Sequence, residues 1–453
     1  MKLYRYRPIE SALRELDNGE FYFASPTELN DPIEGYVKIF WCGDKPAWQG
    51  LLKNFVCSLF YNLQTYLLKS GNFYSAAQEN FLDDLHQKSL LPNLRHFESS
   101  PLSKIFSELE KIFLSKEIVR NVVDFYGGEI KCYGREMEFV LRTVTDTAFK
   151  ICVDKCKSLG MIDADFDEKF FDVEYEISFD DLKSITDEER KRKIDKLENL
   201  NCDLMESGLL YLKFNHRAAN ADFRFRQTML WLRFIFPRTY LEQLEEILYP
   251  NGYVVCFSDT PTNSAMWGNY ADNHRGICFV YNTETLNGGE FMTFAAKHLE
   301  VRPVKYNEQV IEKNFFYMLH HVNFLSAQDW LTGLDGKSKL LAADKVDGYD
   351  EDYREKFYHK LTDWKYEREY RIFLPDEFYS YGNKITRNLK YDLSELRGII
   401  FGIRTTLDDK IRLLQKLERL QKFLNDFEFY QAEYDDETQI ISVREKILLT
   451  NFS

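Results

Sequence analysis

Short apolar runs separated by turn residues open the chain. Residues 3–6 form an extended run, and apolar side chains then recur at helical spacing from residue 9 to residue 16, before Gly19. Residues 21–24 are apolar and β-prone, and Asn30-Asp31-Pro32 has the composition of a turn. The first forty residues therefore predict a strand, a helix and a second strand.

The pattern changes between about Trp41 and Pro250, where long, aromatic-rich helical stretches such as 54–70 and 136–159 dominate. Short strand patterns return after Gly252. The expected elements there are strands at 253–258, 276–281, 366–374 and 398–403, a short helix at 263–271, a helical stretch at 308–361, a helix from Thr406 to Leu420, and a closing ribbon at 427–434 and 439–445. In the helix after Thr406, one stripe is expected to contain Leu407, Ile411, Leu414, Leu417 and Leu420.

Strands thus cluster at both ends of the chain around a helical middle. This order predicts an α+β fold, in which residues 1–41 and 251–453 form a split, strand-rich core and residues 42–250 form a large, mainly helical insertion. The length of 453 residues is sufficient for such a core with a second region of similar size.

Composition supports a folded protein, since 44% of the residues are hydrophobic and 16% are aromatic. The net charge of −14 argues against a grip on nucleic acid or an anionic membrane by the whole surface. The start of the chain has no apolar signal region, and no later window approaches a membrane-spanning length, so we expect a cytoplasmic protein. The eight cysteines are scattered without a C-x-x-C motif, which predicts reduced thiols and no metal site.

Charge is unevenly distributed along the middle region. Residues 163–189 carry a net charge of −10, and the following segment, 213–238, is basic and rich in aromatic residues. Its candidate nucleic-acid or partner contacts are Arg217, Arg224, Arg226 and Arg233. Bases stack on aromatic rings and arginines pair with phosphates, but an amphipathic helix that pairs with the acidic stretch explains the same pattern.

Four short islands combine polar residues with strand-like contexts. They are residues 3–6, 23–35, 256–276 and 364–372. With their sequences LYRY, FASPTELNDPIEG, CFSDTPTNSAMWGNYADNHRG and WKYEREYRI, the chain resembles the bacterial domain of unknown function 2971 family. Asn269 stands where that family usually has His, so the resemblance implies no role for an imidazole there.

The last island carries candidate chemistry. Strand alternation in this island places Glu367, Glu369 and Arg371 on one face. Two carboxylates beside an arginine can be held ionised and directed at a developing positive charge. A cross-strand ion-pair ladder is the structural alternative.

The layout also resembles the ADP-ribosyltransferase fold, whose enzymes use NAD as a co-substrate. Carried over by position, this resemblance implies that Arg5 on the first strand, Ser258 on a middle strand and Glu369 on a late strand are catalytic, with Glu367 activating the acceptor. It further implies a set of NAD-binding residues, namely Tyr6, Ser25, Trp267, Tyr270, His274 and Arg371. Turn chemistry alone explains Asn30 and Asp31, and a site-lining role for these residues and Glu34 stays open.

Together these features lead to one hypothesis and one alternative. The leading hypothesis is an NAD-dependent ADP-ribosyltransferase or NAD glycohydrolase that modifies a protein or nucleic acid, and the resemblance implies a bacterial toxin or phage-defence effector. The alternative is a non-catalytic sensor module that binds nucleic acid or protein through residues 213–238.

Overall fold

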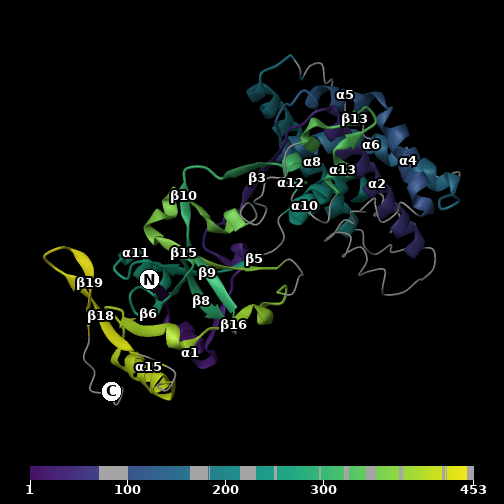
Figure 1. The fold of residues 1–453 in the computed structure, drawn as a ribbon. Coiled ribbons are helices and arrows are strands. Elements are labelled where there is room, and N and C mark those ends of the chain that lie inside the picture. Colours follow the sequence, from purple (N-terminus) through teal and green to yellow (C-terminus); the bar gives the residue numbers. More distant parts are fainter. Residues whose placement is uncertain are drawn as a thin grey trace. The chain divides into compact units, whose positions relative to one another are not determined.

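The computed structural model describes residues 1–70, 100–163, 182, 184–214, 231–248, 252–294, 297–320, 326–342, 354–376, 381–420, 424 and 426–445 (Figure 1). The chain forms two compact units. The first contains residues 1–37, 250–311 and 348–453, and the second contains residues 38–249 and 312–347.

A ten-stranded sheet organises the first unit. Its order is β19-β18-β17-β6-β1-β5-β15-β9-β8-β7. The strands are β1 (Lys2–Arg7), β5 (Gly252–Ser258), β6 (Ile277–Asn282), β7 (Glu284–Leu286), β8 (Gly289–Phe294), β9 (Lys297–Pro303), β15 (Glu369–Pro375), β17 (Leu396–Phe401), β18 (Glu428–Asp435) and β19 (Ile440–Glu445). Neighbours are antiparallel except for β17 and β18, which run parallel. Strands from both ends of the sequence are therefore interleaved in one sheet.

The elements expected at the start of the chain are confirmed. Helix α1 (Ile9–Asn18) follows β1 and ends at Gly19, whose φ of 60° is favourable for glycine. Strand β2 (Glu20–Tyr22) follows and pairs with β16 (Asn388–Lys390). The chain then enters a 3₁₀-helix, Pro26–Glu28.

Elements after Gly252 also match their expected positions in most cases. Helix α11 (Ser264–Tyr270) begins where the Asn263 side chain accepts hydrogen bonds from the amides of Ala265 and Met266. Helix α15 (Leu407–Leu420) begins after Thr406, whose hydroxyl accepts from the Asp409 amide. The β18–β19 ribbon, drawn in yellow in Figure 1, is the predicted closing hairpin.

Apolar side chains cover both faces of the sheet. The larger cluster joins α1 and α15 to the strands and includes Leu16, Phe21, Phe257, Tyr281, Leu396 and Leu417. A smaller cluster is built around Trp267 of α11, with Tyr6, Val280 and Ile400. The sheet is thus buried on two sides, which holds its strands in fixed register.

The second unit is mainly helical. Its helices are α2 (Lys45–Ser70), α4 (Pro101–Leu114), α5 (Glu117–Tyr126), α6 (Gly134–Ser158), α8 (Asp187–Phe214) and α10 (Phe236–Leu248). This agrees with the expected helical stretches 54–70 and 136–159. Seven described cysteines are free thiols, and Cys152 and Cys156 are buried in α6. Among the described helices, none has the length and apolar character that a membrane-spanning segment needs.

The unit boundaries differ from those expected from the pattern. Residues 38–41 and 312–347 belong to the second unit, whereas the sequence assigned both to the core. Tertiary contacts explain the difference: β3 (Val37–Trp41) pairs with β4 (Cys132–Tyr133), and the Lys53 side chain donates to the Thr332 carbonyl. These are long-range pairings that no local pattern encodes.

The prediction of a helical stretch at 308–361 is wrong for its described residues. They form β11 (Ile311–Asn314), β12 (Thr332–Gly333), β13 (Gly336–Lys337) and β14 (His359–Leu361), with α12 (Phe315–Met318) and α13 (Ala327–Trp330) as single turns and short 3₁₀ segments at 339–342 and 356–358. Strand β10 (Lys305–Asn307) lies just before this stretch. Gly336, with φ 125°, closes the β12–β13 hairpin, and β10 pairs in parallel with β14. Strand partners distant in sequence override the local helical spacing here.

The stripe expected on α15 is only partly the buried face. Leu413 and Leu417 are fully buried, whereas 73% of the Leu407 surface is exposed.

We predict that Leu417→Ala lowers the free energy of unfolding by about 2–5 kcal/mol, because it removes a packed side chain and leaves a cavity. Urea denaturation measures the effect. The same substitution at Leu407, on the same helix, should change stability by no more than about 0.5 kcal/mol, and equal losses at both positions would contradict the assigned face.

Candidate functional site

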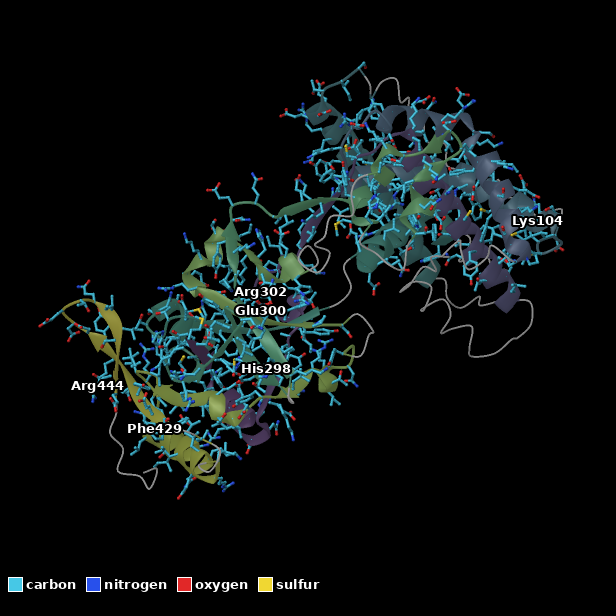
Figure 2. The ribbon with its side chains drawn as sticks, in the orientation of Figure 1. Lys104, His298, Glu300, Arg302, Phe429 and Arg444 are labelled. Carbon is cyan, nitrogen blue, oxygen red and sulfur yellow. The ribbon has the colours of Figure 1, made fainter. Side chains whose placement is uncertain are left out.

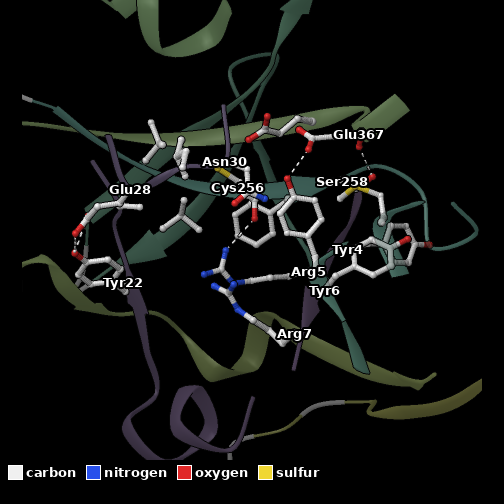
Figure 3. A pocket seen from close by; sticks show the side chains of 18 of the residues that line it. Tyr4, Arg5, Tyr6, Arg7, Tyr22, Glu28, Asn30, Cys256, Ser258 and Glu367 are labelled. Carbon is white, nitrogen blue, oxygen red and sulfur yellow. Dashed lines mark hydrogen bonds between the residues drawn. The ribbon is translucent and has the colours of Figure 1, made fainter. Parts of the chain in front are cut away.

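A cavity of about 490 Å³ lies where β1 and β5 separate. One residue pair, Tyr4 with Ser258, joins these two strands in the sheet. Beyond that pair, residues 5–7 of β1 and 254–257 of β5 both line the cavity, and Figure 3 shows Arg5, Tyr6, Arg7 and Cys256 around it. The split between two neighbouring strands therefore creates the space.

Four further segments complete the walls. The lining residues outside β1 and β5 are Tyr22, Ala24, Glu28, Leu29, Asn30, Met266, Tyr270, Lys360, Glu367, Glu369 and Lys384. Of the residues predicted for the site, Arg5, Tyr6, Ser258, Tyr270, Glu367 and Glu369 converge on this one cavity. Asn30 also lines it, whereas Asp31 accepts the Ile33 amide in a local turn.

Strand register brings the ends of the site together. Ser258 is opposite Tyr4 on one side and opposite Glu369 on the other, so the three residues form a row across β1, β5 and β15. The Ser258 hydroxyl donates to the Glu367 carbonyl at 2.8 Å and accepts from the Thr260 amide at 3.3 Å. Its contacts fix the chain just before β15.

The predicted strand from Tyr366 to Leu374 begins later than expected. Thr362–Glu367 form a 3₁₀-helix, Arg368 has a left-handed backbone with φ 48°, and β15 begins at Glu369. The prediction that alternation alone puts Glu367 on the face of Glu369 and Arg371 is therefore wrong. Glu367 reaches the same cavity through the turn instead.

A buried ion network forms one end of the cavity. The Lys360 ammonium lies 2.6 Å from a Glu367 oxygen, 3.1 Å from Glu369 and 3.5 Å from Glu34. Behind Glu369, the Arg371 guanidinium donates two hydrogen bonds to Glu369, at 2.8 and 2.9 Å, and two to Glu34, at 2.8 and 3.0 Å. Two cations thus pair with three carboxylates, so the carboxylates of this network outnumber its cations by one.

This network separates the two glutamates in acidity. Burial opposes ionisation of Glu369, but Arg371 and Lys360 outweigh it and hold its pKa at about 2. Burial raises the pKa of Glu367, against the attraction of Lys360, and the negative charge of Glu369 adds to the increase. Tyr270 donates to Glu367, and burial together with this carboxylate raises the pKa of the phenol. Such a divergent pair of carboxylates is typical of acid–base sites.

Positive charge lies at the other end. Arg5 is buried, donates from Nη1 to the Cys256 carbonyl at 2.9 Å, and stacks over the rings of Phe21 and Phe257. Arg7 lines the cavity beside it. The cavity therefore has an acidic end and a basic end.

Other predicted NAD-binding residues lie outside the lining. Trp267 is buried, with its ring 5.1 Å from the Tyr6 ring, and the His274 ring, in a left-handed turn, stacks with it. Ser25 begins the 3₁₀-helix Pro26–Glu28 and bonds with the Thr27 hydroxyl. Arg371 supports Glu369 from behind and is fully buried.

Several lining or supporting residues were not predicted. Lys360 is in a stretch interpreted as helix, so no local signal placed it beside the glutamates. For Glu15 the sequence gives a weak signal of burial, because this carboxylate is on the side of α1 that also buries Leu16. Arg7 could have been found from Arg5, because residues two apart in a strand lie on the same face.

Of the four arginines predicted as nucleic-acid or partner contacts in segment 213–238, the structure describes one, Arg233. Arg233 is buried, and its guanidinium donates to Asp146 at 2.5 Å within the second unit. Arg217, Arg224 and Arg226 lie outside the described residues, as does most of the acidic stretch 163–189.

The ion network makes a prediction for acid stability. Because folding lowers the pKa of Glu369, its contribution is complete above about pH 4.5 and is lost as the pH falls towards about 2. We expect Glu369→Gln to cost about 3–5 kcal/mol of unfolding free energy near pH 7. This deficit should shrink as the pH falls below about 4.5, as measured by urea denaturation at stepped pH.

Glu300→Gln is the matched control, because Glu300 pairs with Arg302 on β9, outside this cavity (Figure 2). It is expected to have an effect of at most about 1 kcal/mol, since its pair is partly exposed. A deficit in Glu369→Gln that stays constant from pH 7 to pH 3 would contradict the assigned ionisation.

In comparisons with known proteins, a family model matches a segment of the chain that contains part of this site. Searches of curated proteins and of solved structures each gave no significant match. The model of the family described as "Protein of unknown function (DUF2971)" matches residues 266–372. That segment includes Tyr270, Lys360, Glu367, Glu369 and Arg371, so it supplies the acidic end of the cavity. The match supports the similarity of this chain to that family, over residues 266–372.

Proposed function

We propose that the cavity binds NAD and that the protein cleaves the nicotinamide–ribose bond, either transferring ADP-ribose to a macromolecule or hydrolysing NAD. The observation that carries this proposal is the division of charge within one cavity. NAD has a cationic nicotinamide ring and an anionic pyrophosphate, and the cavity offers carboxylates at one end and arginines at the other.

The acidic end suits the bond that breaks. When the glycosidic C–N bond cleaves, its electron pair leaves with nicotinamide, and the ribose carbon gains oxocarbenium character. An ionised carboxylate fixed beside that carbon stabilises the developing charge more than the ground state. Glu369 is ionised at neutral pH, and Arg371 holds both of its oxygens in position.

Glu367 is the proposed proton acceptor. Water or an acceptor hydroxyl that attacks the ribose must lose a proton, and a carboxylate with a raised pKa accepts it more readily than Glu369 does. Tyr270 and Lys360 each hold one Glu367 oxygen. They orient the carboxylate toward the cavity.

The strand arrangement gives independent support. The resemblance to ADP-ribosyltransferases requires a basic residue on a first strand, a serine on a middle strand and a glutamate on a late strand. Here β1, β5 and β15 are direct neighbours, with Ser258 opposite Glu369 and Arg5 in the same cavity. Arg5, Ser258 and Glu369 thus line one cavity although they are distant in sequence, which supports the proposal.

The acceptor is proposed by class alone, as a protein or a nucleic acid. A bacterial toxin or phage-defence effector remains the context that the family resemblance implies. The alternative, a non-catalytic binding module, depends on residues 213–238. Arg233 of that segment is paired with Asp146, and its other three proposed contacts lie outside the described residues.

Nicotinamide release tests the proposed reaction. Purified protein is incubated with NAD, with and without macromolecular extract, and free nicotinamide is quantified by chromatography. We expect Glu369→Gln to lower kcat by about 10²–10³-fold, because it removes the fixed negative charge. Arg5→Ala should mainly raise KM, since it removes a ligand contact.

Glu300→Gln again serves as the control and should retain wild-type kcat, since it lies outside the cavity. Glu369→Gln is assayed at a temperature below its cooperative unfolding transition, so that the folded variant is compared. Absence of nicotinamide release by the wild-type protein with every acceptor, or equal rates in Glu369→Gln, would refute the proposal.

The pH dependence of the reaction tests Glu367 separately. Because Glu367 accepts a proton in its ionised form, kcat should fall as the pH drops through its raised pKa. Lys360→Met removes a cation beside this carboxylate, which disfavours its ionised form. The acid limb should therefore move to higher pH by about 1–3 units.

Lys416→Met provides the comparison, since Lys416 pairs with Asp17 outside the cavity. Its pH profile should match that of the wild-type protein. An acid limb that does not move in Lys360→Met would assign the proton transfer to another group.

A further inference from the structure

A single buried carboxylate holds two arginines of β1. Glu15 of α1 accepts the Nε–H of Arg5 at 3.2 Å and the Nε–H of Arg7 at 3.0 Å on the same oxygen. Its other oxygen accepts the Tyr281 hydroxyl at 2.9 Å. Both guanidinium groups are therefore anchored through their Nε atoms, and their outer nitrogens point away from Glu15.

This cluster carries an excess of positive charge. Two guanidinium groups face one carboxylate, and they lie side by side in Figure 3. Arg5 Nη1 donates to the Cys256 carbonyl, but no described residue accepts from Arg5 Nη2 or from either Nη of Arg7. Arg5 is almost fully buried, and 29% of the Arg7 side chain is exposed. Clustered donors with unbalanced charge favour an anion with several oxygen acceptors.

A second cavity begins at Arg7. It measures about 370 Å³ and is lined by Arg7, Ser11, Arg14, Glu15, Asn18, Glu20, Tyr22 and Asn388. The first cavity shares Arg7 and Tyr22 with it. The Arg7 guanidinium therefore lies at the junction of two cavities, each of a size that holds part of a small ligand.

The neighbouring carboxylate at this junction is already neutralised. Glu28 accepts the Tyr22 hydroxyl and pairs with Lys384 and Arg387. Tyr22 is thereby held in place at the boundary, and Glu28 does not balance Arg7. Glu20 and Arg14 both line the second cavity.

We propose that Arg5 and Arg7, oriented together by Glu15, form a pyrophosphate clamp at the junction of the two cavities. A dinucleotide then lies with its nicotinamide half in the first cavity and its second nucleoside in the polar second cavity. The identity of the dinucleotide rests on the proposed function, whereas the clamp requires no catalysis. Arg5 and Arg7 contact the phosphates, and Glu15 is a positioning residue.

Isothermal titration calorimetry with ADP-ribose tests the clamp, because this ligand has the pyrophosphate but lacks the bond that is cleaved. Arg7→Ala should weaken ADP-ribose binding about 10–100-fold through the lost charge-assisted hydrogen bonds. Arg7→Lys should fall between it and wild type, since it keeps the charge but loses the fork. Arg412→Ala is the matched control. Arg412 of α15 pairs with Glu10, which is on α1 like Glu15 but outside both cavities. The Arg412→Ala variant should bind ADP-ribose as the wild-type protein does.

Glu15→Gln should weaken ADP-ribose binding similarly while nicotinamide riboside, which has no phosphate, binds to it as it does to wild type. Loss of general structure would reduce both ligands alike. Ser11→Phe, which fills the second cavity, should weaken ADP-ribose but not nicotinamide mononucleotide. No ADP-ribose binding by the wild-type protein, or equal affinity in Arg7→Ala, would overturn the clamp, and unchanged ADP-ribose affinity in Ser11→Phe would overturn the placement of the second nucleoside.

The two proposals fail separately. If Arg7→Ala loses ADP-ribose affinity but the wild-type protein releases no nicotinamide, the clamp stands and the proposed reaction is refuted. If the protein cleaves NAD while Arg7→Ala keeps its ADP-ribose affinity and KM, the reaction stands and the clamp is refuted.

Discussion

The contact between Lys360 and the glutamates at the end of the first-unit cavity is the constraint on which the site depends. Three buried carboxylates would repel one another and lose their hydration, which is costly in a protein interior. Lys360 and Arg371 reduce that cost, and they join β14, the turn before β15 and the Glu34 segment into one structure. Because two cations do not balance three carboxylates, the network leaves negative charge at the cavity wall. The same interaction thus stabilises the fold and gives the site its electrostatic character.

At the opposite end of the cavity the balance is reversed, because cations there outnumber carboxylates. Glu15 is one carboxylate between two arginines, so that cluster retains positive charge. The split of β1 from β5 after the Tyr4–Ser258 pair places both clusters around one space. A ligand that carries a cation and a pyrophosphate complements such a space better than a ligand of a single charge. The proposed reaction and the proposed clamp use opposite ends of this arrangement.

Local signals predicted much of the first unit. The first helix ended at Gly19, and two others began at Asn263 and Thr406, as expected, because each such boundary depends on residues within one turn. The pattern failed between 308 and 361, where β14 pairs with β10, the strand just before this stretch, and Gly336 closes a hairpin. It also failed at Glu367, since a left-handed Arg368 interrupts the expected alternation. At β14 a strand partner distant in sequence, and at Gly336 and Arg368 a backbone with positive φ, gave a conformation that helical or strand spacing does not predict.

The sequence by itself predicted the α+β class and most strands of the large sheet, because these depend on periodicity and caps. The resemblance to ADP-ribosyltransferases completed the set of candidates, six of which line the cavity. The sequence did not determine which charges meet. Lys360 reaches Glu367 and Glu369 through the parallel pairing of β14, and Glu15 reaches Arg5 and Arg7 through the packing of α1 on the sheet. Ion pairing depends on distances of a few ångströms between chain segments, and such distances exist only after the sheet has formed. The tertiary structure alone therefore decided the polarity of the cavity and the junction with its neighbour.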